Sequence, residues 1–196
     1  MPRPAKRDDL IDLAMRLFNR HGYHATGVDR IMEETGIAKT TLYRHFGSKE
    51  ELIVAALTKI DEASRDALRN FVETASNDPR ERLLATFGQL DLWLRDCEFK
   101  GCPFVAAAAE YGTASDPVFQ QVRLHKRLIL AYFEELVRAA KLPNAKDLAR
   151  QIMMLHEGAI AYAQVLGCEG AAESARRAAE RLIDTATPAL PKKSTR

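Results

Sequence analysis

The sequence predicts an all-α protein in which a small three-helix domain precedes a larger helical domain. Apolar residues recur at helical spacing along the whole chain, and no alternating strand pattern is present. Asn-Gly and Asp-Gly, the strongest hairpin signals, do not occur. Residues that begin and end helices, namely Ser, Asp, Gly and Pro, separate the periodic segments.

The first four helices follow from glycines and capping residues. The first is expected over Lys6–His21, with Gly22 after it, and the second is expected to be capped by Thr26 and to end at Thr35-Gly36. A third, short helix covers about Ala38–His45. The segment Ser48-Lys49-Glu50-Glu51 has the form of a capping box and begins a helix of about 27 residues, roughly 40 Å long.

Five further helices are expected. Asp78 and Pro79 begin one, and a short alanine-rich helix follows Gly101-Cys102-Pro103. The others are expected at Pro117–Ala140, from a cap at Asn144 to about Gly167, and at Ala171–Thr187. We therefore divide the chain into a domain at 1–48, a larger domain at 49–187 and a flexible tail at 188–196.

Composition indicates a globular protein without a membrane span. The 196 residues are 46% hydrophobic and 29% charged, and no apolar run approaches ~20 residues. The basic and then acidic N-terminus does not have the form of a secretory signal. Three cysteines without close pairing argue against a disulfide framework, so we expect a reducing, cytoplasmic setting.

The local charge pattern is more informative than the net charge of +2. Between Ala38 and Lys49, basic residues occur without an intervening acid. Ile31, Ile37, Leu42 and Phe46 can pack inward on the first helix, which leaves a polar face directed outward. That face is expected to carry Lys39, Thr40, Thr41, Tyr43, Arg44 and His45. Such side chains suit DNA phosphates and base edges, although a helical hairpin with a solvated basic face is the alternative.

The segment from Gly22 to Leu52 strongly resembles the DNA-binding region of the TetR family of transcriptional regulators. The most specific part is Leu42-Tyr43-Arg44-His45-Phe46 followed by Ser48-Lys49-Glu50-Glu51-Leu52. The resemblance is close over about the first quarter of the chain, and the remainder is similar in helix lengths and order. The resemblance implies a helix-turn-helix and a ligand-responsive repressor that binds a palindromic double-stranded operator as a homodimer. It also implies that the protein is not an enzyme and needs no cofactor.

The resemblance also implies roles for individual residues. Thr26, Tyr43, His45 and Lys49 match phosphate-contacting positions, and Gly27 opens the second helix where it can approach a base. Lys39, Thr40, Thr41 and Arg44 match recognition-helix positions that face the major groove. Thr40 departs from the family pattern, in which many members have glycine, so the operator sequence cannot be transferred from a relative.

The larger domain is a candidate for binding a small molecule. Apolar side chains with a few polar ones would suit such a pocket, although aromatic and methionine residues at helical spacing are usually plain core. The candidate residues are Phe87, Leu90, Trp93, Phe104, Tyr111, Gln121, His125, Leu128, Met153, His156 and Glu157. No metal-ligand spacing is present, so a metal-responsive regulator is disfavoured.

Cys102 has two interpretations. It directly precedes Pro103 and is expected at a helix N-terminus near Lys100, where a thiol can become reactive, so it is a candidate redox or electrophile sensor. The alternative, which we favour, is a buried cysteine that behaves as a small hydrophobe.

The last two helices are expected to form a homodimer interface. One of them carries Ala159, Ala163 and Leu166, with Tyr162 adjacent, and the other carries Ala172, Ala175, Ala179, Leu182 and Ile183. Small residues allow close helix packing, and two such helices from each subunit would make a four-helix bundle. Packing within one subunit is the alternative. The long helix that begins at Ser48 is placed to carry movement from an effector to the DNA-binding residues.

The sequence disfavours two other functions. An enzyme is disfavoured because the chain contains no Gly-x-Ser-x-Gly, P-loop, dinucleotide-binding glycine or His-Glu-x-x-His motif, although a catalytic pair of Cys102 with His125 or His156 stays open. A DNA-binding protein without a ligand is disfavoured because the chain after the DNA-binding residues is longer than dimerisation needs.

Overall fold

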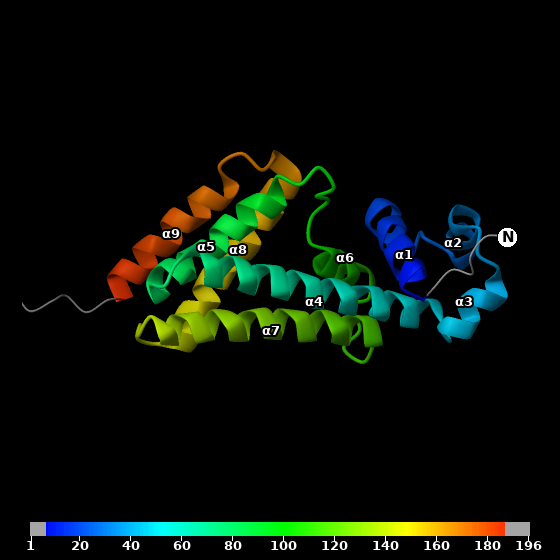
Figure 1. Cartoon of the computed structure of the whole chain (residues 1–196), viewed down its shortest axis with the longest axis horizontal. Coiled ribbons are helices and arrows are strands. Elements are labelled where there is room, and N and C mark those ends of the chain that lie inside the picture. The colour runs from blue at the N-terminus through cyan, green and yellow to red at the C-terminus, as the bar shows by residue number, and fades with distance from the viewer. Residues whose placement is uncertain (1–6, 187–196) are drawn as a thin grey trace, which may run out of the picture. The chain divides into compact units, whose positions relative to one another are not determined.

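The structure, a computed structural model, describes residues 7–186, and this part of the chain is helical without a strand (Figure 1). The predicted tail at 188–196 lies outside the described residues, as do Lys6 and Thr187, the predicted ends of the first and last helices. The helices are α1 (Arg7–His21), α2 (Val28–Thr35), α3 (Lys39–His45), α4 (Lys49–Ala75), α5 (Pro79–Leu94), α6 (Pro103–Glu110), α7 (Pro117–Ala139), α8 (Ala145–Leu166) and α9 (Ala171–Ala186).

The chain forms two compact units. The first comprises the residues up to Asp66 together with Lys100–Leu128, and the second comprises Ala67–Phe99 and the residues from Ile129 on. Helices α4 and α7 each contribute residues to both units. This division reflects packing, whereas the functional division at residue 48 stays a prediction.

A shared apolar core holds α1, α2 and α3 together. Ile31 of α2 and Leu42 of α3 are fully buried, and Phe46 is nearly so, as their spacing predicts. On the α1 side, Phe18 stacks on Tyr23 with ring centroids 5.2 Å apart. The other buried residues of α1 are Leu10, Ile11, Ala14 and Leu17.

The turn between α2 and α3 depends on glycine. Gly36 has φ +66°, in the left-handed region, and its N–H donates to the carbonyl oxygen of Met32 at 2.8 Å. The hydroxyl of Thr35 accepts the N–H of Ile37 at 3.2 Å, so the backbone groups left over at the end of α2 are satisfied locally.

The predicted cap at Thr26 is wrong. Gly27 is the N-cap of α2, and no side chain caps this helix. The Thr26 hydroxyl instead donates to the carbonyl oxygen of Gly22 at 2.7 Å, because the side chain turns inward, against the end of α1. Asn144 does stand at the N-cap of α8, but its backbone is left-handed and its side chain makes no capping bond.

Two other predicted caps are confirmed. The Ser48 hydroxyl accepts the N–H of Glu51 at 3.1 Å, and the Glu51 carboxylate reaches back to the N–H of Gly47 at 2.8 Å, one residue earlier than in the usual capping box. The Asp78 carboxylate accepts the N–H groups of Arg80 and Glu81 at the start of α5. Both helices therefore begin where the sequence places them.

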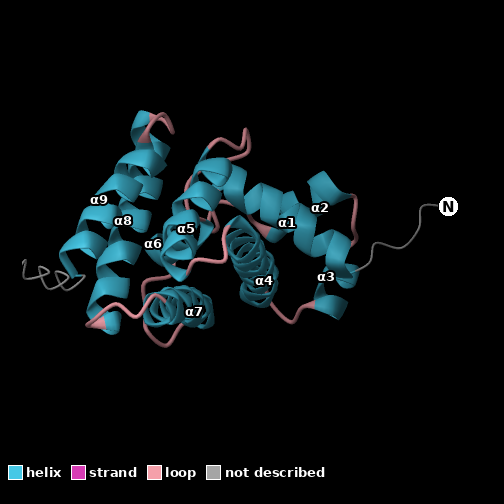
Figure 2. Cartoon of the chain, turned by 60° about the vertical axis from the view of Figure 1, so that its left-hand side comes forward, coloured by secondary structure: helices cyan, strands magenta, loops and turns pink. Residues whose placement is uncertain are grey.

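In the second unit, α8 and α9 lie side by side and pack on α5 (Figure 2). Alanines such as Ala163, Ala172 and Ala179 are buried and let the helix backbones approach closely. An ion pair between Arg80 of α5 and Asp184 of α9 adds a polar contact at the surface. These buried alanines thus serve packing within one chain.

We predict that Gly36→Ala destabilises the protein, because an L-residue at this left-handed φ costs roughly 1–2 kcal/mol. A Cβ would meet no atom within 4 Å at either Gly36 or Gly27, so steric contact is not the cause. The matched control is Gly27→Ala, where φ is −72° and the free energy of unfolding should stay within about 1 kcal/mol of wild type. Urea unfolding measures both variants, and equal stability of the two would contradict the backbone explanation.

Candidate functional site

The outer face of α3 presents the basic and hydroxyl side chains that the sequence singled out. Lys39, Thr40, Tyr43 and Arg44 are exposed, with Tyr43 at 44% despite its size. Thr41 and His45 are half-buried, and Gly27 at the start of α2 is exposed. The short helix therefore offers one polar surface, while Leu42 holds its other side in the core.

Thr26 does not share this surface. Its side chain is 0% exposed, and its hydroxyl is bonded to a backbone carbonyl at the end of α1. The predicted contact of the Thr26 side chain with phosphate is therefore incompatible with this structure. The residue stabilises the approach to α2.

Two lysines of this region make contacts with the protein. The Lys39 amine lies 3.5 Å from the Asp29 carboxylate of α2, and both side chains are exposed. The Lys49 amine donates to the carbonyl oxygen of His24 at 3.3 Å. Partial burial lowers the Lys49 pKa, while the negative charges of Glu50 and Glu110 oppose that shift. Lys49 therefore lies against the loop between α1 and α2.

The same loop contacts α6. Glu110, the last residue of α6, accepts the N–H groups of Tyr23 and His24 through its carboxylate. The Tyr23 hydroxyl donates to the carbonyl oxygen of Pro103 at 3.0 Å, and burial raises the pKa of this phenol well above its usual range. The ring of Tyr111 packs against His24, with centroids 4.5 Å apart. Burial also raises the Tyr111 pKa, to about 12.

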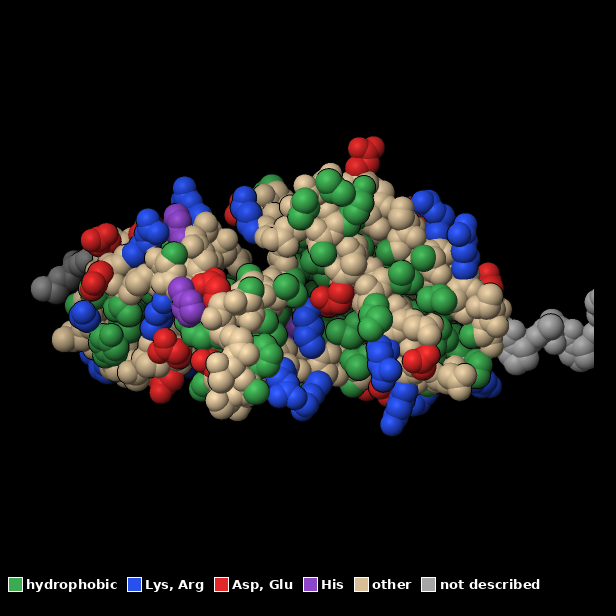
Figure 3. All heavy atoms as spheres, turned by 180° about the vertical axis from the view of Figure 1, so that it is seen from behind, with side chains coloured by type: hydrophobic (Ala, Val, Ile, Leu, Met, Phe, Trp, Pro, Cys, Tyr) green, Lys and Arg blue, Asp and Glu red, His purple; other side chains and the backbone are tan. Residues whose placement is uncertain are grey.

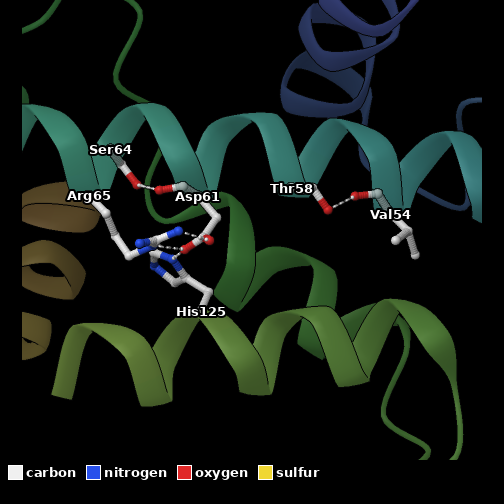
Figure 4. Close-up of polar contacts among 6 residues, drawn as sticks. All are labelled: Val54, Thr58, Asp61, Ser64, Arg65 and His125. Carbon is white, nitrogen blue, oxygen red and sulfur yellow. Dashed lines mark hydrogen bonds and ion pairs between the residues drawn. The ribbon is translucent and has the colours of Figure 1, made fainter. Parts of the chain in front are cut away.

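A buried polar cluster joins α4 and α7 within the first unit (Figure 4). Asp61 is only 3% exposed, and its carboxylate receives two hydrogen bonds from Arg65, each 3.0 Å long. Nδ1 of His125 lies 2.7 Å from the same carboxylate. The His125 ring stacks on Phe104 of α6 with centroids 3.6 Å apart and planes 5° apart.

The charges around Asp61 determine its ionisation. Burial alone would raise its pKa, but the hydrogen bonds and positive charges of Arg65 and His125 outweigh burial, so the pKa is lowered. Asp61 was not singled out from the sequence. Its place among apolar residues on α4 was a signal, because an acid there must be compensated when the helix packs.

The eleven residues predicted to bind a small molecule fall into two groups. Phe104, Tyr111, Gln121, His125 and Leu128 belong to the first unit, and Phe87, Leu90, Trp93, Met153, His156 and Glu157 belong to the second. In the second group, the His156 ring lies 5.6 Å from the rings of both Phe87 and Phe133. Trp93 packs edge-on against Phe99. Most of the apolar members are core residues of their own unit, and their role in binding stays a prediction.

Cys102 is the N-cap of α6 and is buried. Its sulfur is not used to cap the helix, and it accepts a hydrogen bond from the Lys126 amine at 3.5 Å. The N-terminal position agrees with the sequence. Burial restricts access of a reagent to the sulfur, so the role of Cys102 as a sensor stays a prediction.

Helix α8 leaves an apolar stripe uncovered. Its exposed members repeat at helical spacing and include Val165, which is 80% exposed. They are Met154, Gly158, Ala161, Tyr162, Val165 and Leu166. Figure 3 shows hydrophobic side chains exposed among polar ones on one face of the molecule. Large apolar residues exposed together usually indicate a surface for another macromolecule.

The described part of the chain contains neither a candidate metal site nor a candidate membrane span. No group of three or more His, Cys, Asp or Glu residues among 7–186 is arranged to hold a metal ion. Within the same residues, no helix combines the length and apolar character needed to cross a bilayer.

Comparison with protein-family models identifies both parts of the chain. Residues 10–56 match the model of bacterial regulatory proteins of the tetR family. Residues 79–179 match the tetracyclin repressor-like C-terminal domain. The second match extends the likeness well beyond the helix-turn-helix.

Individual relatives agree with the family models. The HTH-type transcriptional regulator LmrA of Bacillus subtilis is 30% identical over 158 residues, which are 79% of this chain and 84% of the relative. The HTH-type transcriptional activator FasR of Mycolicibacterium smegmatis is 38% identical over 85 residues, 43% of this chain and 38% of the relative. The crystal structure of SCO4454, a TetR-family transcriptional regulator from Streptomyces coelicolor, matches with a TM-score of 0.85 at 29% sequence identity. The match covers 92% of this chain and 95% of the SCO4454 chain.

We predict that Asp61→Asn lowers the free energy of unfolding by about 3 kcal/mol at neutral pH, because it leaves Arg65 and His125 without their carboxylate. The wild-type pKa of Asp61 is lowered, so its stabilisation is complete above about pH 4 and is lost as pH falls through the lowered value. The difference between variant and wild type should therefore shrink in strong acid. Asp66→Asn, an exposed change on the same helix, is the control, and an equal loss in both variants would refute the role of the cluster.

Proposed function

The chain belongs to the TetR family of bacterial transcriptional regulators, and we propose that it is a dimeric repressor that leaves its operator when a small molecule binds in its C-terminal part. The observation that carries the proposal is the exposed set of basic and hydroxyl side chains on α3, held in place by a buried core. Repression is the commoner mode in the family. FasR is named as an activator, so activation is the alternative.

The proposed DNA contacts divide by chemistry. Arg44, Lys39, Thr40 and Thr41 face the major groove, where arginine pairs with guanine and threonine contacts bases or the thymine methyl group. Tyr43, His45 and Lys49 contact phosphates, and Gly27 lets the backbone approach DNA closely. Lys39 must leave Asp29 to bind DNA, which is an inexpensive change because exposed ion pairs contribute only about 0–1 kcal/mol.

The apolar stripe of α8 is proposed to pack against the same stripe of a second copy. A two-fold axis would bring α8 and α9 of both chains into one four-helix bundle. It would also present two α3 helices to one face of DNA, and such dimers read half-sites one helical turn apart, about 34–36 Å. The exposure of Val165 and Leu166 supports this surface.

The effector is proposed to act through α4. This helix begins at Lys49, beside the DNA-binding residues, and continues into the second unit as one uninterrupted element. A ligand that binds one position of α4 more tightly than another would change the separation of the two recognition helices. The predicted aromatic and polar residues of the C-terminal part supply the binding chemistry.

We predict that Arg44→Ala weakens operator binding roughly five- to 150-fold, because a bidentate arginine contact to a base contributes roughly 1–3 kcal/mol. Lys49→Ala should weaken binding to all sequences alike and reduce the salt slope by about one. Fluorescence anisotropy at several salt concentrations, with DNA flanking the protein's own gene, measures both. Arg150→Ala, an exposed arginine of α8, should behave as wild type. A wild-type protein that binds flanking and scrambled DNA equally would contradict operator recognition at that locus.

We predict that Val165→Glu converts the dimer to a monomer, because two charges would be buried where two stripes meet. Sedimentation equilibrium gives the mass directly. Val105→Glu places the same charge on another exposed valine, on α6, and should leave the dimer intact. A dimer that persists in the α8 variant would place the interface elsewhere.

A further inference from the structure

The loop between α1 and α2 is held by one carboxylate of α6. Glu110 Oε1 accepts the N–H of Tyr23 at 2.9 Å, and its Oε2 accepts the N–H of His24 at 2.5 Å. Both contacts join residues more than 80 positions apart within the first unit. Hydrogen bonds to an ionised acceptor are roughly twice as strong as neutral ones, so this pair fixes the loop backbone.

Glycine makes this approach feasible. Gly22 has φ +87°, and a Cβ at that position would lie 3.2 Å from Oε1 of Glu110. A side chain at residue 22 would thus crowd the carboxylate as well as strain the backbone. The chain direction changes here, immediately before the two helices that form the DNA-binding surface.

The same loop is also tied to the start of α6. The Tyr23 hydroxyl donates to the carbonyl oxygen of Pro103, while its ring stacks on Phe18 of α1. Tyr23 is nearly fully buried, so this bond is shielded from competing water. One loop residue therefore contacts α6 near both of its ends, through its backbone and its hydroxyl.

We infer that Glu110 is a positioning residue for DNA recognition: its carboxylate sets the orientation in which α2 and α3 are presented to the operator. The inference rests on the proposed function and adds a second connection to it, through α6, besides the one through α4. Docking two recognition helices at once requires a fixed orientation, whereas binding to random DNA depends on phosphate contacts that tolerate several orientations. Loss of the carboxylate should therefore reduce specific binding more than nonspecific binding.

Helix α6 is also connected to the buried polar cluster. Phe104, in its first turn, stacks on His125, and the carboxylate of Asp61 holds the His125 ring. His125 is one of the residues predicted to bind the effector, so α6 links an effector-binding candidate to the DNA-binding surface.

The experiment compares Glu110→Gln with wild type. A glutamine accepts through one oxygen and presents an amide N–H to the other donor, so one loop contact is lost. Glu62→Gln, an exposed change on α4, controls for removal of one negative charge. The probes are a duplex enriched by the wild-type protein from a random-sequence library and an unselected duplex. Hydrogen exchange of the Tyr23 and His24 amides is measured in parallel, without DNA.

Glu110→Gln should lose about tenfold in affinity for the enriched duplex and keep its affinity for the unselected one, with faster exchange at Tyr23 and His24. Equal affinity for the enriched duplex in variant and wild type overturns the inference. So does an equal loss on both duplexes with a lowered melting temperature, which would indicate a purely structural role. If Glu110→Gln does not fold, Glu110→Asp keeps the charge but withdraws the carboxylate from the N–H groups of Tyr23 and His24, and it is expected to show the same selective loss. Equal affinity of this variant and wild type for the enriched duplex would likewise overturn the inference.

Different results would contradict the proposed function and the role of Glu110. If the wild-type protein enriches no duplex, the proposed function fails, and the exchange rates of Tyr23 and His24 still report whether the carboxylate holds the loop. If the wild-type protein enriches a duplex and Glu110→Gln binds it equally well, the proposed function stands and only the role of Glu110 is lost.

Discussion

The proposed DNA-binding surface depends on a shared apolar core that is buried beneath helices too short to be stable alone. Helix α2 has 8 residues and α3 has 7, well below the length at which isolated helices are stable in water. Their geometry is held by Ile31, Leu42 and Phe46 against α1. The exposed side chains of α3 are oriented because the opposite side of the same helix is fixed.

Two carboxylates supply the directional contacts that an apolar core lacks. Asp61 orients His125 between α4 and α7, and Glu110 orients the loop that leads into α2. Both carboxylates are connected to α6. The His125 ring, which Asp61 holds, stacks on Phe104 of α6, and Glu110 is the last residue of α6. Burial of the Asp61 carboxylate costs several kcal/mol unless partners compensate, so its contacts with Arg65 and His125 specify one arrangement more than they add stability.

Helix α8 combines two chemically different apolar surfaces. Ala159 and Ala163 are buried within the unit, while Met154 and Val165 remain exposed on another side. The sequence predicted an interface between subunits from these alanines together with Leu166 and Tyr162. The alanines are buried within one chain, whereas Leu166 and Tyr162 are exposed. The larger exposed residues are the better candidates for contact with a second copy, because they would bury more apolar area there.

The sequence by itself determined the helical fold, the helix-turn-helix and the residues on its outer face, because helical periodicity, capping residues and the Leu42–Leu52 segment act over short distances. It misassigned Thr26, whose hydroxyl reaches back to Gly22, and it did not reveal Asp61 or Glu110. Asp61 contacts a residue 64 positions away, and Glu110 contacts residues more than 80 positions away. Only the tertiary structure decided them, since a charged side chain acquires a specific partner when packing removes it from water.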